Sequence, residues 1–205
     1  MKRFFEKNLY YFKNMIIFFG GNAFIYFIVK LFIKDYNLIG WNIDKNIPFI
    51  KSFIYIYLLW YPYLFVSYYF VYKKDLSKFK RLLKSTVMGM LVGNIFYVVY
   101  PTMIDRPVVD SFNSLTTFLV YITYKADIPV NCFPSLHCLL SFVIMFYVCF
   151  DKCMGKIFRL IVFIISTLIV LSTVFVKQHV LIDVIGAFII AIIVCVYKNS
   201  LKRAT

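Results

Sequence analysis

The sequence has few of the residues that usually carry catalysis in soluble enzymes. Among 205 residues there are 2 histidines and 9 acidic residues, against 23 lysines and arginines. The 5 cysteines form no Cys-x-x-Cys pair and no zinc-like spacing with histidine, so we interpret them as structural filler. No Gly-x-Ser-x-Gly motif is present, which argues against a serine hydrolase. Scattered carboxylates and so few histidines predict no cluster of metal ligands, and neither a metal nor another cofactor is expected.

Internal repeats and low-complexity linkers are also missing, which favours a single domain over residues 1–205. Apolar residues, in contrast, make up 62% of the chain, and the mean hydropathy is +0.82. A soluble domain of this length could not bury so much apolar surface, whereas lipid covers the outside of a membrane protein. The composition therefore predicts an all-α integral membrane protein.

Six apolar segments are long enough to cross a bilayer as helices. They lie at roughly 14–33, 53–72, 85–101, 134–150, 157–176 and 179–197. Charged residues delay the first segment, and no small-residue cleavage site follows it. We therefore expect an uncleaved first span rather than a signal peptide, and a bundle of six transmembrane helices.

The net charge of +14 would suggest a nucleic-acid partner in a soluble protein. Here the basic residues flank the apolar segments, so membrane topology and anionic lipid explain them better, and no nucleic acid is expected. Most of them lie in the N-terminal segment, the second and fourth loops and the C-terminal tail. The positive-inside rule then predicts a multi-pass cell-membrane protein with both termini in the cytoplasm and the third and fifth loops outside.

The third loop is the longest, running roughly from Thr102 to Phe133. Residues 111–124 within it place apolar side chains at helical spacing but are too few to span a bilayer. These side chains are Phe112, Leu115, Phe118, Leu119 and Ile122. The pattern predicts an interfacial helix over a site, with a plain connector as the alternative. In the first loop, Trp41 is interpreted as an interfacial anchor without a chemical role.

Both histidines lie where an outer loop meets an apolar segment. His137 follows Pro134 and Ser135 at the predicted start of the fourth helix, where free N–H groups and a hydroxyl can hold an anion and the imidazole can move a proton. His179 precedes Asp183 by one helical turn, and a carboxylate there can fix the imidazole tautomer. A membrane-edge histidine without a role and a plain helix-edge ion pair are the alternatives.

Arg106, followed by a proline, lies in the same outer compartment and offers a planar fork for phosphate. The histidines, the arginine and the intramembrane aspartate thus all fall on one predicted side. Such placement favours a shared site, because unrelated residues would be scattered over both faces.

Three segments carry a resemblance to a known family. They are Arg106-Pro107, then Pro134-Ser135-Leu136-His137, then Ser172 to His179 with Asp183 and Gly186. Together they resemble the three-part signature of the type 2 phosphatidic acid phosphatases, which share a fold with vanadium haloperoxidases. The resemblance covers roughly Tyr100 to Gly186. It implies that His179 is the nucleophile and forms a phosphohistidine, that Asp183 orients it, that His137 protonates the leaving oxygen, and that Arg106 and Ser135 hold phosphate oxygens.

Two positions depart from that signature. Val99 stands where the family usually has a lysine, and Thr173 where it usually has an arginine. Lys177 lies close by and can replace one of these cations as a phosphate-binding group. The arrangement is similar to the branch that contains inositol phosphorylceramide synthase and related head-group transferases.

These observations predict a membrane-embedded, metal-independent phosphatase that hydrolyses lipid phosphate or diphosphate esters on the extracytoplasmic face. The first alternative is a phosphotransferase that moves a phospho-head-group to an alcohol acceptor. An alternative of another class is a lipid-binding membrane protein with a decayed site, which the missing cations at positions 99 and 173 favour. The expected partners are a lipid phosphate substrate and membrane lipids, and the sequence sets neither the substrate nor the oligomeric state.

Overall fold

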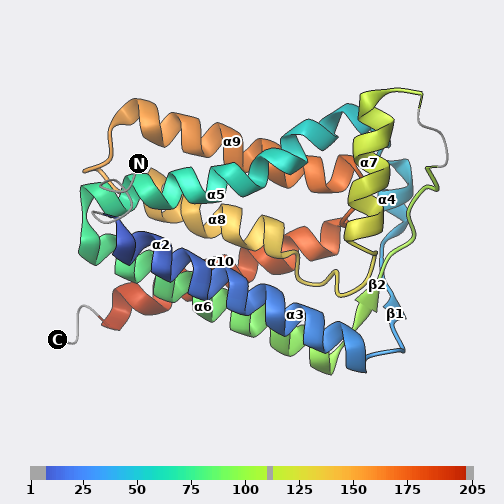
Figure 1. Cartoon of the computed structure of the whole chain (residues 1–205), viewed down its shortest axis with the longest axis horizontal. Coiled ribbons are helices and arrows are strands. Elements are labelled where there is room, and N and C mark those ends of the chain that lie inside the picture. Colours follow the sequence, from blue (N-terminus) through green and yellow to red (C-terminus); the bar gives the residue numbers. More distant parts are fainter. Residues whose placement is uncertain (1–7, 110–112, 202–205) are drawn as a thin grey trace.

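The chain folds into a bundle of long helices with short elements covering one end (Figure 1). The computed structural model describes residues 8–109 and 113–201. In chain order the elements are α2 (Leu9–Met15), the π-helical turn η1 (Ile16–Gly20), α3 (Gly21–Phe32), β1 (Asn37–Leu38), α4 (Asn42–Asn46), the 3-10 turn η2 (Lys51–Phe53), α5 (Ile54–Lys74), α6 (Leu76–Val99), β2 (Thr102–Met103), α7 (Leu115–Ala126), α8 (Leu136–Cys149), α9 (Lys156–Phe175) and α10 (Leu181–Leu201). Each of the six predicted apolar segments contains a helix, so the all-α class is confirmed.

Four helical stretches are long and apolar enough to cross a membrane. They are Leu9–Phe32, Lys51–Lys74, Leu76–Val99 and Lys156–Phe175. The other two apolar helices, Leu136–Cys149 and Leu181–Val196, are shorter. A bundle of six full spans therefore stays a prediction.

The helix that contains the third predicted apolar segment begins before that segment. Helix α6 begins at Leu76 rather than near residue 85, because the Asp75 side chain accepts a hydrogen bond from the backbone N–H of Lys78 at 3.0 Å and caps the helix. The basic residues expected in the second loop are thus helical: Lys73 and Lys74 end α5, and the others lie in the first turns of α6. Apolar character begins only after those turns, so hydropathy alone places the boundary too late.

Helix α8 lies at the centre of the bundle. It packs against α5, α6, α9 and α10, and its side chains Leu139, Val143, Ile144 and Val148 are fully buried. Glycine permits close approach of α6, since a Cβ at Gly93 would stand 3.0 Å from Leu136 and one at Gly89 would stand 3.3 Å from Leu139. Packing against four other helices explains why most of this helix is apolar.

The outward faces of the surrounding helices are strongly apolar. Phe24 on α3, Ile157 on α9 and Ile193 on α10 are each more than half exposed. A water-soluble monomer rarely exposes apolar surface on this scale, whereas lipid would cover it. The exposed surface thus agrees with the membrane class expected from composition.

The site end of the bundle is built from the first and third loops. Strand β1 pairs in parallel with β2, with Asn37 opposite Thr102, which ties the two loops together. Helices α4 and α7 lie at this end, and the first described turn of α2 lies at the other (Figure 1). Helix α7 confirms that the third loop contains a helix, and its interfacial position stays a prediction. Ser111 and Phe112, which belonged to that expectation, lie outside the described residues.

Candidate active site

His179 lies in the turn between α9 and α10, just before the last helix rather than inside it. The turn is held by the carbonyl of Thr173, which accepts hydrogen bonds from the backbone N–H groups of Gln178 at 2.9 Å and His179 at 3.1 Å. Lys177 makes the reversal with a φ of 53°, in the left-handed region. These contacts fix the histidine backbone directly in front of α10.

Asp183, which is fully buried in the first turn of α10, holds the imidazole. Its Oδ2 lies 3.1 Å from Nδ1 of His179 and accepts a second hydrogen bond, also 3.1 Å, from the backbone N–H of Val180. A carboxylate at Nδ1 favours the tautomer with the proton on that nitrogen, which leaves a lone pair on Nε2. The predicted contact between His179 and Asp183 is therefore present in the structure.

His137 lies in the first turn of α8 and faces the same place. Its ring is stacked against Tyr57 with centroids 4.7 Å apart and lies 4.2 Å from the ring of Trp60. The ring centroids of His137 and His179 are 6.0 Å apart. His137 Nε2 is buried and has no hydrogen-bond partner among the described residues. Two imidazoles so placed can act on a single group between them.

Ser135 is the N-cap of α8. Its side chain accepts a hydrogen bond from the backbone N–H of Cys138 at 3.3 Å, and its own N–H donates to the carbonyl of Asp183 at 3.3 Å. The residue is fully buried. These bonds join the start of α8 to the start of α10, and they bring His137 and His179 together.

Arg106 connects the third loop to the histidine turn. Its guanidinium donates to the carbonyls of Tyr124 at 2.6 Å and Asp127 at 2.8 Å, and to the Gln178 side-chain oxygen at 3.0 Å. It also lies over the Tyr124 ring, 4.0 Å from the centroid. Burial lowers the pKa of Arg106 from its usual value. Because a guanidinium has about five N–H donors, these contacts leave some for an anion.

Lys177 is held by the first loop. Its ammonium donates to the carbonyls of Asp44 at 2.8 Å and Ile47 at 2.6 Å. Burial lowers the pKa of Lys177, and the nearby Asp44 carboxylate acts in the opposite direction. The structure shows the ammonium bonded to the backbone of the first loop, so its binding of phosphate stays a prediction.

Asp44 in α4 contacts the start of α10, and sequence reasoning missed this residue. Its Oδ1 accepts a hydrogen bond from the backbone N–H of Leu181 at 2.9 Å, and its Oδ2 accepts one from the N–H of Trp41 at 2.7 Å. The carboxylate thereby caps the N-terminus of α10 from a distant part of the chain. A single aspartate in a polar loop gives no local signal for this contact.

Two cavities reach His179 from different sides. One, of about 520 Å³, has four charged residues in a lining that also contains apolar side chains, and we call it the polar cavity; these residues are Asp44, Lys45, Arg106 and Lys177. The other, of about 440 Å³, is mainly apolar and includes Phe19, Tyr26, Trp60, Leu64, Phe65 and both histidines in its lining. His179 therefore lies in the walls of both cavities.

Several buried polar atoms near the second cavity have no hydrogen-bond partner among the described residues. These atoms are Oδ1 and Nδ2 of Asn131, Nε2 of Gln178 and Nε2 of His137. All three residues line that cavity. Buried polar groups are normally paired, so these atoms indicate where a polar ligand or water binds.

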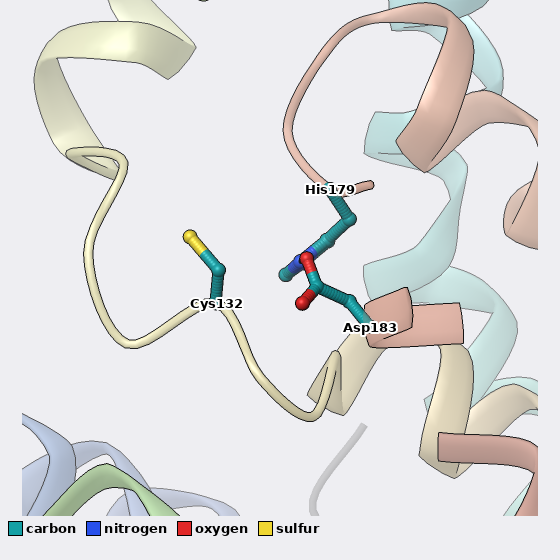
Figure 2. A group of neighbouring side chains, drawn as sticks. All are labelled: Cys132, His179 and Asp183. Carbon is teal, nitrogen blue, oxygen red and sulfur yellow. The ribbon is translucent and has the colours of Figure 1, made fainter. Parts of the chain in front are cut away.

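Cys132 lies beside His179 and Asp183, although the sequence predicted no cluster of metal ligands. One ligand atom from each of Cys132, His179 and Asp183 lies within 4.8 Å of the others, and all three residues are buried (Figure 2). Burial raises the pKa of the Cys132 thiol well above its usual value, and the carboxylates of Asp183 and Asp127 raise it further. The fold brings these residues together from a connection, a turn and a helix start, which their spacing along the sequence does not indicate. The absence of a metal stays a prediction.

Comparison with known proteins gives one match. The sequence model of the PAP2 superfamily matches residues 82–203. No curated protein and no solved structure matches the chain. The matched segment contains α8, α9 and α10, and with them both histidines and Asp183.

Proposed function

The chain belongs to the PAP2 superfamily, and from that premise we propose that it is an integral-membrane phosphatase that hydrolyses lipid phosphate or diphosphate esters through a phosphohistidine. Membership of the superfamily suggests phosphatase or phosphotransferase activity on phosphate esters. The observation that carries the proposal is the His179 imidazole, held by Asp183 at 3.1 Å, with the unpaired Nε2 of His137 opposite it.

The proposed reaction has two displacements at phosphorus. In the first, His179 Nε2 attacks phosphorus, the bond to the leaving oxygen breaks, and a proton from His137 passes to that oxygen. In the second, water attacks the phosphohistidine while giving its proton to His137, and the bond between phosphorus and nitrogen breaks. The Nδ1 proton of His179 stays on the ring throughout, hydrogen-bonded to the Asp183 carboxylate. That carboxylate also stabilises the positive charge that develops on the ring.

The charged groups around the polar cavity support binding of the phosphoryl group. Arg106 and Lys177 are both in its lining, as is His179. Their bonds to backbone carbonyls hold them in place before substrate binds, so little orientational freedom is lost on binding. Preorganised cations of this kind stabilise the charge that develops on phosphoryl oxygens.

The apolar cavity supports a lipid as the substrate. It is lined by α3 through Tyr26, by α5 through Leu64 and Phe65, and by α8 through Leu136. The tail of a lipid would occupy this apolar lining while its phosphate reached the histidines. Substrate would then arrive sideways from the outer leaflet, with both termini of the chain in the cytoplasm.

Transfer to an alcohol is the second candidate, and the presence of two cavities favours it. His179 can be reached through the polar cavity while a lipid occupies the apolar one. An acceptor alcohol arriving by the polar route would replace water in the second displacement. Hydrolysis and transfer share the phosphohistidine, so the products distinguish them.

The test is phosphate release by the purified protein in detergent with EDTA, across a panel of lipid monophosphates and diphosphates. We expect EDTA-resistant release that falls at least about a thousandfold in His179→Ala, because the nucleophile is lost. Phosphate release by Asp183→Asn should also be strongly reduced. Asp151→Asn, which changes a carboxylate at the opposite end of α8, is the matched control and should keep full activity.

Full activity in His179→Ala would overturn the mechanism. A new phosphorylated product that forms only when alcohols are added would assign the chain to the transferases. If wild-type protein gives neither release nor transfer, the decayed-site alternative replaces the proposal.

A further inference from the structure

The group formed by Cys132, His179 and Asp183 offers three kinds of metal ligand at one point. A thiol sulfur, an imidazole nitrogen and a carboxylate oxygen lie within 4.8 Å of one another. Figure 2 shows that they come from three segments: the connection before α8, the turn before α10, and the first turn of α10. Sulfur, nitrogen and oxygen together form a donor set that suits zinc better than magnesium or calcium.

A second observation concerns the Asp183 carboxylate. Its Oδ2 is bonded to His179 and Val180, but its Oδ1 has no hydrogen-bond partner among the described residues. The residue is 0% exposed. A buried carboxylate oxygen without a partner is costly, and a cation would remove that cost. The unpaired atom therefore points to a ligand that the protein itself does not provide.

The geometry is compatible with zinc after a small movement. Zinc binds sulfur at about 2.3 Å and nitrogen or oxygen at about 2.0–2.2 Å, so the ligand atoms must approach one another by roughly 1 Å. Cys132 lies in an irregular connection rather than in a helix, and a rotation of its side chain moves the sulfur further than that. Three protein ligands leave the fourth position of a tetrahedral zinc site open to water.

We propose that Cys132, His179 and Asp183 form a Zn²⁺ site, and that the bound ion inhibits the enzyme by occupying the His179–Asp183 pair. Zinc at this point replaces the thiol proton of Cys132, which passes to solvent, and it bonds the Asp183 carboxylate and one nitrogen of the His179 ring. The carboxylate is then withdrawn from the imidazole. The histidine is then no longer oriented for attack on phosphorus. The inhibition rests on the proposed function, whereas the binding of zinc does not.

Binding is tested first, without any substrate. Purified protein is stripped with EDTA, incubated with Zn²⁺, freed of excess metal by gel filtration and analysed for zinc by mass spectrometry. Wild type should retain zinc near one ion per chain, and Cys132→Ala should bind it at least about 100-fold more weakly, since even outer partners of a zinc site contribute 10- to 100-fold. Cys153→Ala removes an exposed cysteine away from the site and should behave as wild type.

Equal zinc retention by wild type and Cys132→Ala would overturn the site. Should Cys132→Ala fail to fold, Asp183→Asn provides the second variant: it keeps the shape of the side chain, removes an anionic ligand, and should also lose zinc. Circular dichroism and gel-filtration profiles check that each variant is folded.

Inhibition is tested on the activity of each variant relative to its own metal-free rate. Zn²⁺ should lower the rate of wild type and of Cys153→Ala, and EDTA should restore both rates. For the same degree of inhibition, Cys132→Ala should need a zinc concentration at least about 100-fold higher. Zinc that binds through Cys132 without lowering the rate would overturn the inhibitory half. A protein that binds zinc but hydrolyses no substrate would overturn the proposed function and leave the zinc site standing.

Discussion

Asp44 and Lys177 form a reciprocal contact between the first loop and the histidine turn. The Asp44 carboxylate caps α10 at Leu181, and the Lys177 ammonium donates to the Asp44 carbonyl. His179 lies between Lys177 and Leu181 along the chain, so this contact holds the histidine from both sides. Asp44 is accordingly a positioning residue, which acts through the backbone and not on the substrate.

Replacing Asp44 should therefore loosen the turn that carries His179. Asp44→Ala loses both acceptors, and we expect a loss of about 0.5–2 kcal/mol in unfolding free energy, as for other helix caps. We also expect kcat to fall about tenfold or more with a smaller change in KM, because a small misplacement of a catalytic group is costly. Thermal unfolding in detergent and steady-state kinetics measure the two effects.

Asp35→Ala is the matched control, since Asp35 is an exposed carboxylate in the same loop. Asp44→Asn, which keeps one acceptor oxygen, should recover part of the rate. The positioning role fails if Asp44→Ala and Asp35→Ala are kinetically alike.

At this scale the sequence predicts part of the site and no more. The pairing of His179 with Asp183 could be read from their spacing, and the resemblance placed His137 beside them. The roles of Arg106 and Lys177 stay predictions, because the structure shows first their bonds to backbone carbonyls. Contacts such as that between Asp44 and Leu181 join residues far apart in sequence, and nothing in the local pattern indicates them.

Between elements, the closest approach in the site region involves α10 and the connection before α8. A Cβ added to Gly186 on α10 would stand 2.4 Å from Cε2 of Phe133. The Phe133 ring also packs edge-on against Phe96, with centroids 5.2 Å apart, so it has little freedom to withdraw. Glycine at this position sets the distance between α10 and the segment that leads into His137.

Gly186→Ala should consequently destabilise the bundle by roughly 1–3 kcal/mol, the usual cost of overpacking. Gly21→Ala is the matched control, because a Cβ there meets nothing within 4 Å. In that helix alanine should be neutral or stabilise by about 0.4–1 kcal/mol. Thermal unfolding of the two variants compares them directly, and an equal melting temperature would contradict the tight contact.

Asp151 joins the start of α6 to the connection between α8 and α9. Its carboxylate lies 2.5 Å from the Lys78 ammonium and accepts a hydrogen bond from the backbone N–H of Cys153 at 2.9 Å. Burial acts to raise the pKa of Asp151, but these two contacts outweigh it and the pKa is lowered from 3.8. The contact therefore favours the folded state above pH 3.8 and loses that contribution as the pH falls through the lowered pKa.

We expect the difference in melting temperature between wild type and Asp151→Asn to be largest at neutral pH and to shrink below pH 3.8. Taking the difference between the two proteins removes the effect of other carboxylates. A difference that is constant with pH would show that the ion pair does not stabilise the fold.

The helices were predictable because each contains a long apolar run, whereas their ends depended on capping groups. The basic residues after Asp75 looked like a loop, and the cap at Asp75 makes them helical instead. Strands β1 and β2 were not predicted. Two residues in each strand carry no recognisable pattern, and their pairing depends on loops that the rest of the fold brings together.

On the scale of the whole molecule, the bundle has two distinct ends. Helices α4 and α7 lie at one end, and the connection between α8 and α9 lies at the other (Figure 1). The turn that carries His179 contacts α4 through Lys177 and Asp44, so it belongs to the first end. All five cysteines are among the described residues, and Cys153 in that connection is the exposed one. A single accessible thiol therefore marks the end away from the site.

Thiol labelling of whole cells should distinguish the two ends. A membrane-impermeant maleimide should not label wild type at Cys153, which the charge pattern places in the cytoplasm, but should do so after permeabilisation. Asn46→Cys, at the exposed end of α4, should be labelled in intact cells. Labelling of Cys153 but not of the new thiol would reverse the predicted orientation.

The enclosed position of α8 has a consequence for the surrounding bilayer. Its 14 residues span about 21 Å, against a hydrocarbon thickness of about 30 Å. The outer helices can meet hydrophobic mismatch by tilting, while α8 is packed against four other helices. In the proposed membrane arrangement, His137 at its first turn would lie below the headgroup plane, and a lipid phosphate would have to descend to meet it. We therefore expect acyl-chain length in the host membrane to be part of the barrier to substrate access.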